Sequence, residues 1–340
     1  MPSSGLRLQG QRQFTTVPGM PMLQQHPRPD VPIVPDAAPG NWVDHHAPRT
    51  LRPYLRLARA DRPVGAWLLL FPCWWSQALA ELSLGRAYPN LWYALLFAAG
   101  AFVMRGAGCV YNDIVDREYD AGVARTRNRP IPSGQVTVTA AKVFMVALCF
   151  TGLAVLLQFN GFAVVLGVAS LGLVAIYPFM KRFTYWPQLV LGLTFKWGAL
   201  MGWAAVTGAL AWPALLLYAG CILWTIGYDT IYAHQDKEDD ELLGLKSTAL
   251  RFGDETKPWL VAFYGGAVMF WACAGYLAGA GLIAAAALVS VIAHFVWQVR
   301  TLDMSDPQNC LVRFRSNCTV GWLLVAGLVA QMAWGALMGG

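Results

Sequence analysis

Residues 87–120 read AYPNLWYALLFAAGAFVMRGAGCVYNDIVDREYD, passing from an apolar run whose first charge is Arg105 into a cluster of acidic residues. A second apolar run ends at Tyr228 and is followed in the same way by acidic residues. Of the 19 Asp and Glu residues, four lie in 113–120 and six in 229–241. Carboxylates beside membrane-length apolar segments are costly unless a partner neutralises them. This pattern predicts a membrane protein whose acidic clusters bind cations.

The composition argues against a soluble globular protein. The chain of 340 residues is 56% hydrophobic and 13% charged, with a mean hydropathy of +0.44, whereas soluble domains carry about 25% charged residues. The stretches 143–180, 197–228 and 258–299 contain no Asp, Glu, Lys or Arg, and a membrane span needs about 20 apolar residues. Interrupting the apolar runs at Gly, Pro and Asn predicts an all-α polytopic membrane protein with nine transmembrane helices. The predicted spans are 64–83, 88–110, 138–157, 161–180, 187–207, 211–231, 258–277, 280–299 and 318–338.

Lys and Arg gather in alternate connections between these spans. Most of them lie in 117–142, 181–182, 237–257 and 300–315, whereas the intervening connections are short and nearly uncharged. Because excess Lys and Arg mark the inner side of a membrane, both acidic clusters are expected on the inner face and the C-terminus outside. The net charge of +6 is then explained by topology and by anionic lipid or diphosphate, without nucleic acid.

The first 50 residues differ in composition from the rest. They are rich in Pro, Gln, Gly and His and have no acidic residue before Asp30. Residues 1–50 are predicted to be a disordered extension; a mitochondrial transit peptide is the alternative, because Arg7 and Arg12 fit an acid-poor leader. Residues 51–340 form the predicted membrane domain, which begins with a basic and apolar segment suited to a short interfacial helix.

The first acidic cluster continues the second predicted span toward the inner surface. On a helix, Asp113, Asp116 and Asp120 have i, i+3 and i+7 spacing and therefore share one face. Asn112 adds a neutral oxygen beside them. A solvated helix end is the alternative explanation, and it fits Glu118 better than a stripe of Asp beside the bilayer.

The second acidic cluster repeats this arrangement after the sixth predicted span. Asp229, Tyr232, Asp236 and Asp240 fall on one helical stripe. Like charges at i, i+4, such as those of Asp236 and Asp240, destabilise an isolated helix, so a bound cation would explain them. The remaining acids of this cluster fit a solvated helix end.

Oxygen ligands on two facing stripes favour a hard divalent cation. Mg²⁺ prefers oxygen ligands and completes its shell with water and phosphate oxygens, and it neutralises a leaving diphosphate. The clusters therefore predict a Mg²⁺-dependent enzyme acting on a phosphorylated lipid. The candidate ligands on the two stripes are Asn112, Asp113, Asp116, Asp120, Asp229, Asp236 and Asp240.

Basic residues follow the first acidic cluster directly, in the segment RTRNRPIPSG at 125–134. Arg125 and Arg129 have i, i+4 spacing, and the guanidinium fork suits phosphate oxygens. Tyr177 and Lys181, also four residues apart, close the fourth span on the same side. These side chains are predicted to face the diphosphate; for Lys181 a simple topological anchor is an equally good explanation.

Three long motifs resemble those of the UbiA superfamily of intramembrane aromatic prenyltransferases. They are NDxxDxxxD at 112–120, RTxxRPIPSG at 125–134, and YDTIYAHQDKEDD at 228–240 followed by LGLKSTALRFG at 243–253. Further stretches are similar to the branch of this superfamily that uses 4-hydroxybenzoate in ubiquinone synthesis. These stretches are 56–72, 104–109 and 185–195. The resemblance runs from about residue 51 to the C-terminus.

The resemblance implies nine transmembrane helices around a central cavity that opens sideways to lipid. It implies transfer of a polyprenyl group from polyprenyl diphosphate to the ring carbon ortho to the hydroxyl of 4-hydroxybenzoate, with Mg²⁺ as cofactor. Arg105 matches a basic residue suited to the benzoate carboxylate. The implied catalytic residues are Asp116, Asp120, Asp229, Asp236 and Asp240. The implied metal ligands are Asn112, Asp113, Asp116, Asp120, Asp236 and Asp240. The implied substrate-binding residues are Arg59, Arg105, Asn112, Arg125, Arg129, Tyr177 and Lys181.

Two basic residues fall inside predicted spans. Arg105 lies two turns before the first metal motif, where snorkelling to the interface is the alternative to binding a carboxylate. Lys196 lies about 15 Å into the fifth span by helix rise and departs from the pattern of the family. An intramembrane Lys suggests a functional role, and snorkelling into a polar cavity explains it equally well.

Other functions agree with parts of the sequence. A prenyltransferase of the same family could use homogentisate, a naphthoate or a porphyrin as acceptor. CDP-alcohol phosphotransferases also place Asp clusters in membranes, but their DGxxAR spacing is absent here. A cation transporter would carry its acidic residues near the membrane midplane, whereas the acidic clusters here are expected at the inner ends of the spans. The expected location is the bacterial inner membrane with the site facing the cytoplasm; the alternative is the mitochondrial inner membrane with the site facing the matrix.

Overall fold

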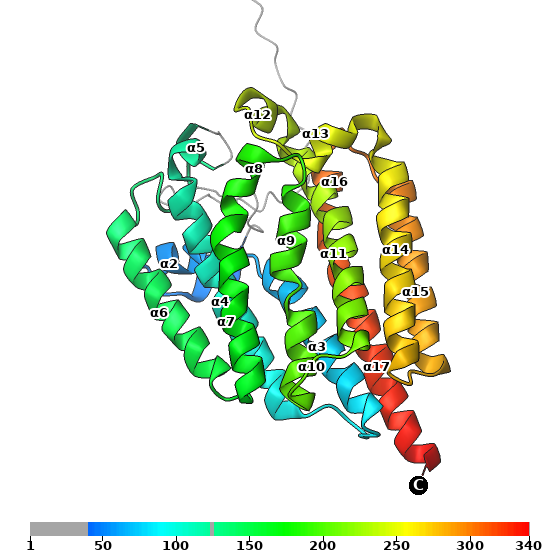
Figure 1. Ribbon diagram of the computed structural model, residues 1–340. Helices are drawn as coiled ribbons and strands as arrows, with labels where there is room; N and C mark the ends of the chain where they lie inside the picture. Colours follow the sequence, from blue (N-terminus) through cyan, green and yellow to red (C-terminus); the bar gives the residue numbers. More distant parts are fainter. Residues whose placement is uncertain (1–39, 123–125, 340) are drawn as a thin grey trace, which may run out of the picture. The chain divides into compact units, whose positions relative to one another are not determined.

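The computed structural model describes residues 40–122 and 126–339, and within these ranges it is entirely helical (Figure 1). Each of the nine predicted spans coincides with a long helix or a pair of consecutive helices. These are α3 (Val64–Ser83), α4 (Leu91–Val115), α6 (Val138–Leu156), α7 (Gly161–Ile176), α9 and α10 (Pro187–Phe195 and Gly198–Thr207), α11 (Trp212–Ala233), α14 (Thr256–Leu277), α15 (Leu282–Thr301) and α17 (Asn317–Gly339).

Eight helical stretches in the described part of the chain are long and apolar enough to cross a membrane. The helix outside this set is α3. Its 20 residues are enough to span a membrane, but Trp, Ser, Gln and Glu81 lower its mean hydropathy. Glu81 is buried, and its carboxylate accepts the backbone N–H of Asn90 at 2.9 Å. The chain is therefore a multi-pass membrane protein, and α3 is the one predicted span outside this set.

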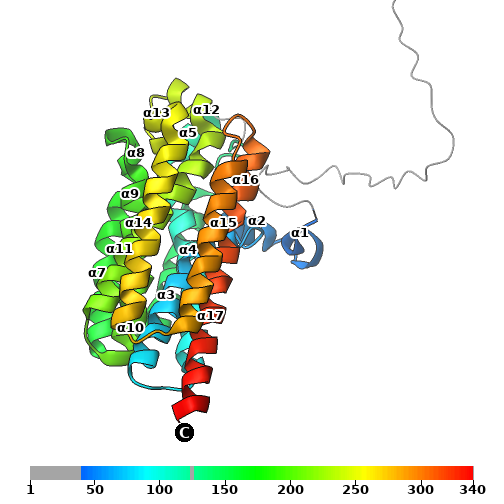
Figure 2. The same ribbon diagram turned by 90° about the vertical axis from the view of Figure 1, so that its right-hand side faces the viewer.

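Short helices connect the spans. They are α1 (Trp42–His46), α2 (Arg52–Leu57), α5 (Arg117–Gly122), η1 (Tyr177–Phe179), α8 (Met180–Phe183), η2 (His234–Asp236), α12 (Lys237–Leu242), α13 (Thr248–Phe252), η3 (Gly253–Glu255) and α16 (Pro307–Arg315). In Figures 1 and 2, α5, α8, α12 and α13 gather at the end of the bundle opposite the C-terminus. Both acidic clusters therefore lie at one end, as the distribution of Lys and Arg predicts.

Side-chain caps fix where several spans begin. Asn90, Thr137 and Asn160 each accept a hydrogen bond from the backbone N–H three residues later, at the starts of α4, α6 and α7. Such a cap is worth about 1 kcal/mol. Asn160 also donates to the carbonyls of Ala204 and Ala205, which ties the start of α7 to the end of α10.

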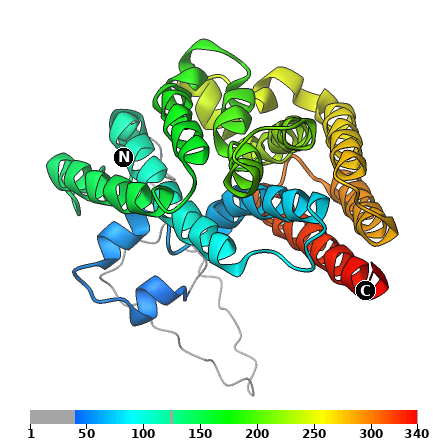
Figure 3. The ribbon, with the colours of Figure 1, turned by 60° about the horizontal axis from the view of Figure 1, so that its bottom comes forward.

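Neighbouring spans pack in an order that closes the bundle on itself (Figure 3). α4 packs between α6 and α3, and α17 packs between α3 and α15. α14 contacts α15 and α11, while α11 contacts α9, and α7 completes the circuit between α9 and α6. The half-span α10 instead packs on α3, and buried side chains fill the interior at that end of the bundle.

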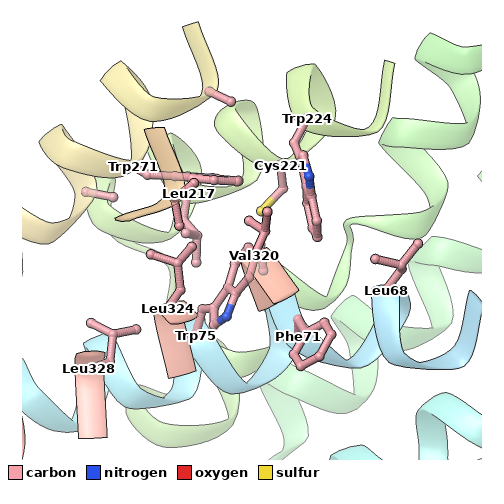
Figure 4. Packing of buried hydrophobic residues seen from close by; sticks show 14 of the residues in the cluster. Leu68, Phe71, Trp75, Leu217, Cys221, Trp224, Trp271, Val320, Leu324 and Leu328 are labelled. Atoms are coloured by element: carbon pink, nitrogen blue, oxygen red, sulfur yellow. The ribbon is translucent and has the colours of Figure 1, made fainter. Parts of the chain in front are cut away.

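Aromatic side chains from α3, α11 and α14 form the centre of this filled interior (Figure 4). The ring of Trp75 lies 5.3 Å from that of Trp224 and 5.2 Å from that of Trp271. Trp75 also donates from Nε1 to the carbonyl of Gly321 at 3.1 Å, which satisfies the indole N–H without water. These contacts hold three helices that are distant in sequence against α17.

The close approach of α10 to α3 depends on two glycines four residues apart. A Cβ on Gly202 would lie 2.3 Å from the carbonyl oxygen of Cys73, and one on Gly198 would lie 2.4 Å from the Cys73 sulfur. Ser76 donates from its hydroxyl to the carbonyl of Ala199 across the same contact. Small residues at this spacing let helix backbones approach in membranes.

Helical structure begins inside the segment that the sequence predicts to be disordered. Asn41 caps α1, and Asp44 of α1 forms an ion pair of 2.7 Å with Arg56 of α2. Trp42 donates from Nε1 to the carbonyl of Ala60 at 2.8 Å. The predicted boundary at residue 50 therefore lies within a connected pair of short helices, and the predictions for residues 1–39 concern a part of the chain outside the described residues.

Candidate active site

A cavity of about 370 Å³ opens among the charged ends of α4, α5, α9, α11 and α12. It is lined by both acidic clusters and by the basic residues that the sequence pairs with them. The predicted site residues in its lining are Arg59, Arg105, Asn112, Asp113, Asp116, Asp120, Arg129, Tyr177, Lys181, Asp229, Asp236 and Asp240. Arg125 lies outside the described residues. All other predicted site residues thus surround one cavity.

The first acidic cluster spans a break between two helices. α4 ends at Val115 and α5 begins at Arg117, so the cluster is not the continuous helix that the spacing predicts. Backbone hydrogen bonds from Asp116 to Asn112 and from Asp120 to Asp116 bridge the break, each at 2.9 Å. Helical register is therefore kept across the break, and the carboxylates still face the same cavity.

Two arginines hold the outer carboxylates of this cluster. Asp113 is fully buried and accepts from Arg59 at 2.7 Å and from Arg129 at 3.3 Å. Arg129 also contacts Asp120 at 2.8 Å, so one guanidinium bridges two carboxylates. Burial raises the pKa of Asp120 above its usual range, and the adjacent charge of Arg129 opposes that rise.

Asp116 is held from the other side of the cavity by the end of the fourth span. Its carboxylate contacts Lys181 at 2.7 Å and Arg182 at 3.4 Å. Asn112 donates from Nδ2 to the same carboxylate at 3.1 Å and accepts from the Tyr177 hydroxyl at 3.3 Å. Tyr177 of η1 and both Lys181 and Arg182 of α8 therefore contact residues of the first acidic cluster.

The second acidic cluster is divided among three helices. Asp229 lies in α11, Asp236 ends η2, and Asp240 lies in α12. The 3₁₀ turn interrupts the single helix that the spacing predicts, yet Tyr232 and these three carboxylates all line the cavity. The backbone N–H of Lys246 donates to the carbonyl of Lys181 at 2.8 Å, which connects the loop after α12 to α8.

The donor set suits a hard cation that is shared with a substrate. Within the described residues no three Asp, Glu, His or Cys side chains are grouped closely enough to bind a metal ion by themselves. Mg²⁺ is commonly bound by one or two carboxylates together with substrate phosphates. Oδ2 of Asp113 is buried without a hydrogen-bond partner in the described structure, so it is an oxygen that a cation could satisfy.

Arg105 of α4 lines the cavity about two helical turns before Asn112. Its guanidinium lies over the ring of Phe195 at 4.9 Å, and its Nε is buried without a hydrogen-bond partner in the described residues. A Cβ on Gly65 would lie 2.6 Å from this Nε, so the absence of a side chain at position 65 makes room for Arg105. The site thus contains a half-buried cation able to receive an anion.

Several cavity residues were not predicted from the sequence. Phe195, Tyr228 and Phe314 line the cavity, and Phe314 packs against Tyr228 and Tyr232 with ring centroids 5.7 and 4.6 Å apart. Arg182, which belongs to the basic connection 181–182 and was not predicted as a site residue, contacts Asp116 at 3.4 Å. Apolar helix positions carry no sequence signal that separates a cavity wall from a lipid-facing surface. The ion pair between Arg182 and Asp116 did have a signal, because Arg182 is adjacent to the predicted site residue Lys181.

Known proteins resemble this chain in sequence. The model of the UbiA prenyltransferase family matches residues 69–321. Two relatives are named 4-hydroxybenzoate polyprenyltransferase, mitochondrial: the Aedes aegypti protein is 50% identical over 284 residues, covering 82% of this chain and 63% of that protein. The Homo sapiens protein is 49% identical over 290 residues, covering 85% of this chain and 77% of that protein.

Solved structures share the fold. A UbiA homologue from Aeropyrum pernix K1 superposes with a TM-score of 0.65 at 26% identity, covering 78% of this chain and 98% of that chain. A UbiA homologue from Archaeoglobus fulgidus, bound to GPP and Mg²⁺, superposes with a TM-score of 0.60 at 20% identity, covering 83% of this chain and 99% of that chain. Since the family model matches most of the sequence, the chain belongs to the UbiA prenyltransferase family.

Proposed function

We propose that this protein transfers a polyprenyl group from polyprenyl diphosphate to the ring carbon ortho to the hydroxyl of 4-hydroxybenzoate, a step of ubiquinone biosynthesis. The products are 3-polyprenyl-4-hydroxybenzoate and diphosphate. The names of the relatives support the acceptor, and the observation that carries the proposal is the single cavity that combines two acidic clusters with Arg105. Such a cavity offers one end to a diphosphate and the other to an aromatic carboxylate.

The diphosphate end is formed by Arg129 and Lys181 facing the two acidic clusters. Both cations are occupied by carboxylates of the first cluster, and phosphate oxygens would replace or share those contacts. Arg125, which lies outside the described residues, completes this group in the proposal. Positioned cations of this kind stabilise the charge that builds on the leaving diphosphate as the carbon–oxygen bond breaks.

Mg²⁺ is proposed as the cofactor, bound by Asn112, Asp116 and Asp120 from the first cluster and by Asp236 and Asp240 from the second. Asp113 is proposed as a further oxygen ligand. When bound, the ion would neutralise diphosphate charge as a Lewis acid. The Mg²⁺ in the Archaeoglobus fulgidus structure supports this choice of ion.

The acceptor end is formed by Arg105, whose guanidinium would bind the benzoate carboxylate. Phe195, Tyr228 and Phe314 supply aromatic faces around it, and such faces stabilise a cation through their quadrupole. The allylic carbon left by diphosphate departure forms its new bond with the ring carbon ortho to the hydroxyl. Asp229, which lines the cavity, is proposed to accept the ring proton and so restore aromaticity.

The proposed orientation places the cavity on the cytoplasmic side of a bacterial inner membrane or on the matrix side of the mitochondrial inner membrane. The names of the two relatives support the mitochondrial alternative. Fractionation of cells that express the full chain, combined with protease accessibility of the loop 237–247, would test both location and sidedness.

Purified protein in lipid vesicles with ¹⁴C-labelled 4-hydroxybenzoate and polyprenyl diphosphate tests the activity. We expect label in a lipid-extractable product when Mg²⁺ is present, loss of that product with EDTA, and recovery when excess Mg²⁺ is added. Homogentisate and a dihydroxynaphthoate serve as competing acceptors. Lack of labelled lipid with every prenyl chain length would overturn the proposal, and preference for another acceptor would redirect it to a different member of the family.

A further inference from the structure

Lys196 lies at the break between α9 and α10, beneath the cavity rather than within its lining. Its side chain has no exposed surface, which rules out snorkelling to water. Its ammonium donates to the carbonyl oxygen of Leu68 at 2.6 Å and lies over the ring of Trp224 at 4.4 Å and that of Tyr228 at 5.2 Å. The side chain therefore joins α3, α11 and the broken fifth span.

The carbonyl of Leu68, which accepts this hydrogen bond, lacks its usual donor within the helix. In an α-helix the carbonyl of Leu68 would accept from the backbone N–H of residue 72, but residue 72 is Pro72, inside α3. Proline has no N–H to donate, and a backbone carbonyl left unpaired at membrane depth is costly. The Lys196 ammonium thus occupies the place of the donor that Pro72 removes.

We propose that Lys196 is a positioning residue that replaces the missing backbone donor of Pro72 and thereby fixes the wall of the acceptor end of the cavity. Three residues link the two. Leu68 and Tyr228 line the cavity, and Lys196 contacts the first through its carbonyl and the second through its ring. Phe195, adjacent to Lys196 in the chain, supports the guanidinium of Arg105.

The expected consequence differs between the two substrates, and it rests on the proposed function. Movement of α3 against α9 would displace Phe195 and Leu68, both beside the acceptor end, whereas Arg129 and Lys181 belong to other elements. Loss of the Lys196 hydrogen bond is therefore expected to weaken binding of the aromatic acid more than binding of the prenyl diphosphate.

A double-mutant cycle tests the structural step without any assay of activity. Lys196→Met removes the donor, and Pro72→Ala restores a backbone N–H at the same carbonyl. We expect Lys196→Met to lower the Tm of the detergent-solubilised protein by several degrees more in the Pro72 background than in the Pro72→Ala background. In the Pro72 background the substitution leaves the Leu68 carbonyl unpaired, whereas with Ala at position 72 the backbone N–H of that residue pairs with it. Removal of the buried charge is common to both arms of the cycle and cancels.

Lys142→Met is the matched control, since Lys142 is an exposed lysine of α6. Its effect on Tm should be the same in both backgrounds. Equal effects of Lys196→Met in the two backgrounds would overturn the inference, even if the enzyme proves active as proposed. If the wild-type chain shows no transferase activity, the proposed function fails while the stability cycle still reports on the hydrogen bond.

Kinetics provide the second readout. In active protein, Lys196→Met should raise KM for 4-hydroxybenzoate by about tenfold, the equivalent of one lost hydrogen bond, with a much smaller change in KM for the prenyl diphosphate. Pro72→Ala should restore most of the lost affinity. An equal rise in both KM values, or no rescue by Pro72→Ala, would contradict a positioning role at the acceptor end.

Discussion

Arg59 donates from Nη2 to Oδ1 of Asp113 at 2.7 Å, and it does so from a left-handed backbone conformation with φ of 59°. Among the described residues it is the one non-glycine residue with positive φ. It follows the end of α2, where the N–H of Ala60 donates to the carbonyl of Leu55 and closes the turn. Glycine is the usual residue in such a position, and here the arginine side chain provides the ion pair to Asp113 instead.

Substitution of Arg59 should therefore separate backbone strain from the ion pair. Arg59→Ala and Arg59→Gly both remove the guanidinium from the fully buried Asp113, so both should lose prenyl transfer. Arg59→Gly also relieves the left-handed conformation, which costs an L-residue roughly 1–2 kcal/mol. We expect thermal unfolding of Arg59→Gly at a higher Tm than Arg59→Ala, with activity equally low in both.

Two outcomes would speak against this account of Arg59. Equal Tm values for the two variants would show that the backbone at position 59 is unstrained. Full activity of Arg59→Gly would show that Arg129, 3.3 Å from the same carboxylate, holds Asp113 without help.

Gly65→Ala should impair the enzyme without unfolding it. The added methyl would lie 2.6 Å from Nε of Arg105, and the neighbour that must move is a flexible side chain rather than backbone. We expect KM for 4-hydroxybenzoate to rise about tenfold or more while the Tm stays near that of the wild type, since a charged hydrogen bond is worth about 1.5–3 kcal/mol. Gly108→Ala, on α4 with open space around its Cβ, is the control; equal kinetics for the two variants would refute the role of Gly65.

The fold could be predicted to a large extent because the bilayer imposes a length and a polarity on every span. The nine apolar segments are helices at the predicted positions, and alternate connections carry the basic residues. The interruption of the fifth span at Lys196 could not be predicted from the chain alone. The Lys196 ammonium pairs there with the carbonyl of Leu68 in another helix, and no local pattern reports that α10 packs on α3.

The charged part of the candidate site was predictable, because an unpaired charge beside a membrane span has a high free-energy cost. Carboxylates such as Asp113 and Asp116 beside apolar runs needed partners, and the structure supplies Arg59 and Lys181. What periodicity could not reveal is the break of the helix at Asp116, since the hydrogen bond of its N–H to Asn112 preserves the face across the break. The aromatic wall, including Phe195, was missed because hydrophobicity is shared by lipid-facing and cavity-facing positions.

Asp116→Asn should abolish activity, because it removes the charge that meets both Lys181 and Arg182. Loss of one well-placed electrostatic group typically costs about 100- to 1,000-fold in rate, and we expect at least the lower figure in the labelled-product assay. Glu118→Gln makes the same change of charge two residues away, at an exposed side chain whose ion pair within the described residues is with Arg117. It should retain wild-type activity, and comparable losses in both variants would dismiss the assignment of Asp116.

Gly202→Ala should destabilise the protein through backbone contact between α10 and α3. Its Cβ would lie 2.3 Å from the carbonyl oxygen of Cys73 and 2.7 Å from the backbone nitrogen of Gln77, and neither atom can rotate away. Overpacking of this kind costs typically 1–3 kcal/mol, more than the gain of about 1 kcal/mol in helix propensity from Gly to Ala. Gly172→Ala in α7 gains the same propensity with no atom within 4 Å of the new methyl. Thermal unfolding in detergent should therefore show a lower Tm for Gly202→Ala and an unchanged or higher Tm for Gly172→Ala; a Gly202→Ala protein as stable as the wild type would mean that α10 and α3 are not held at this distance.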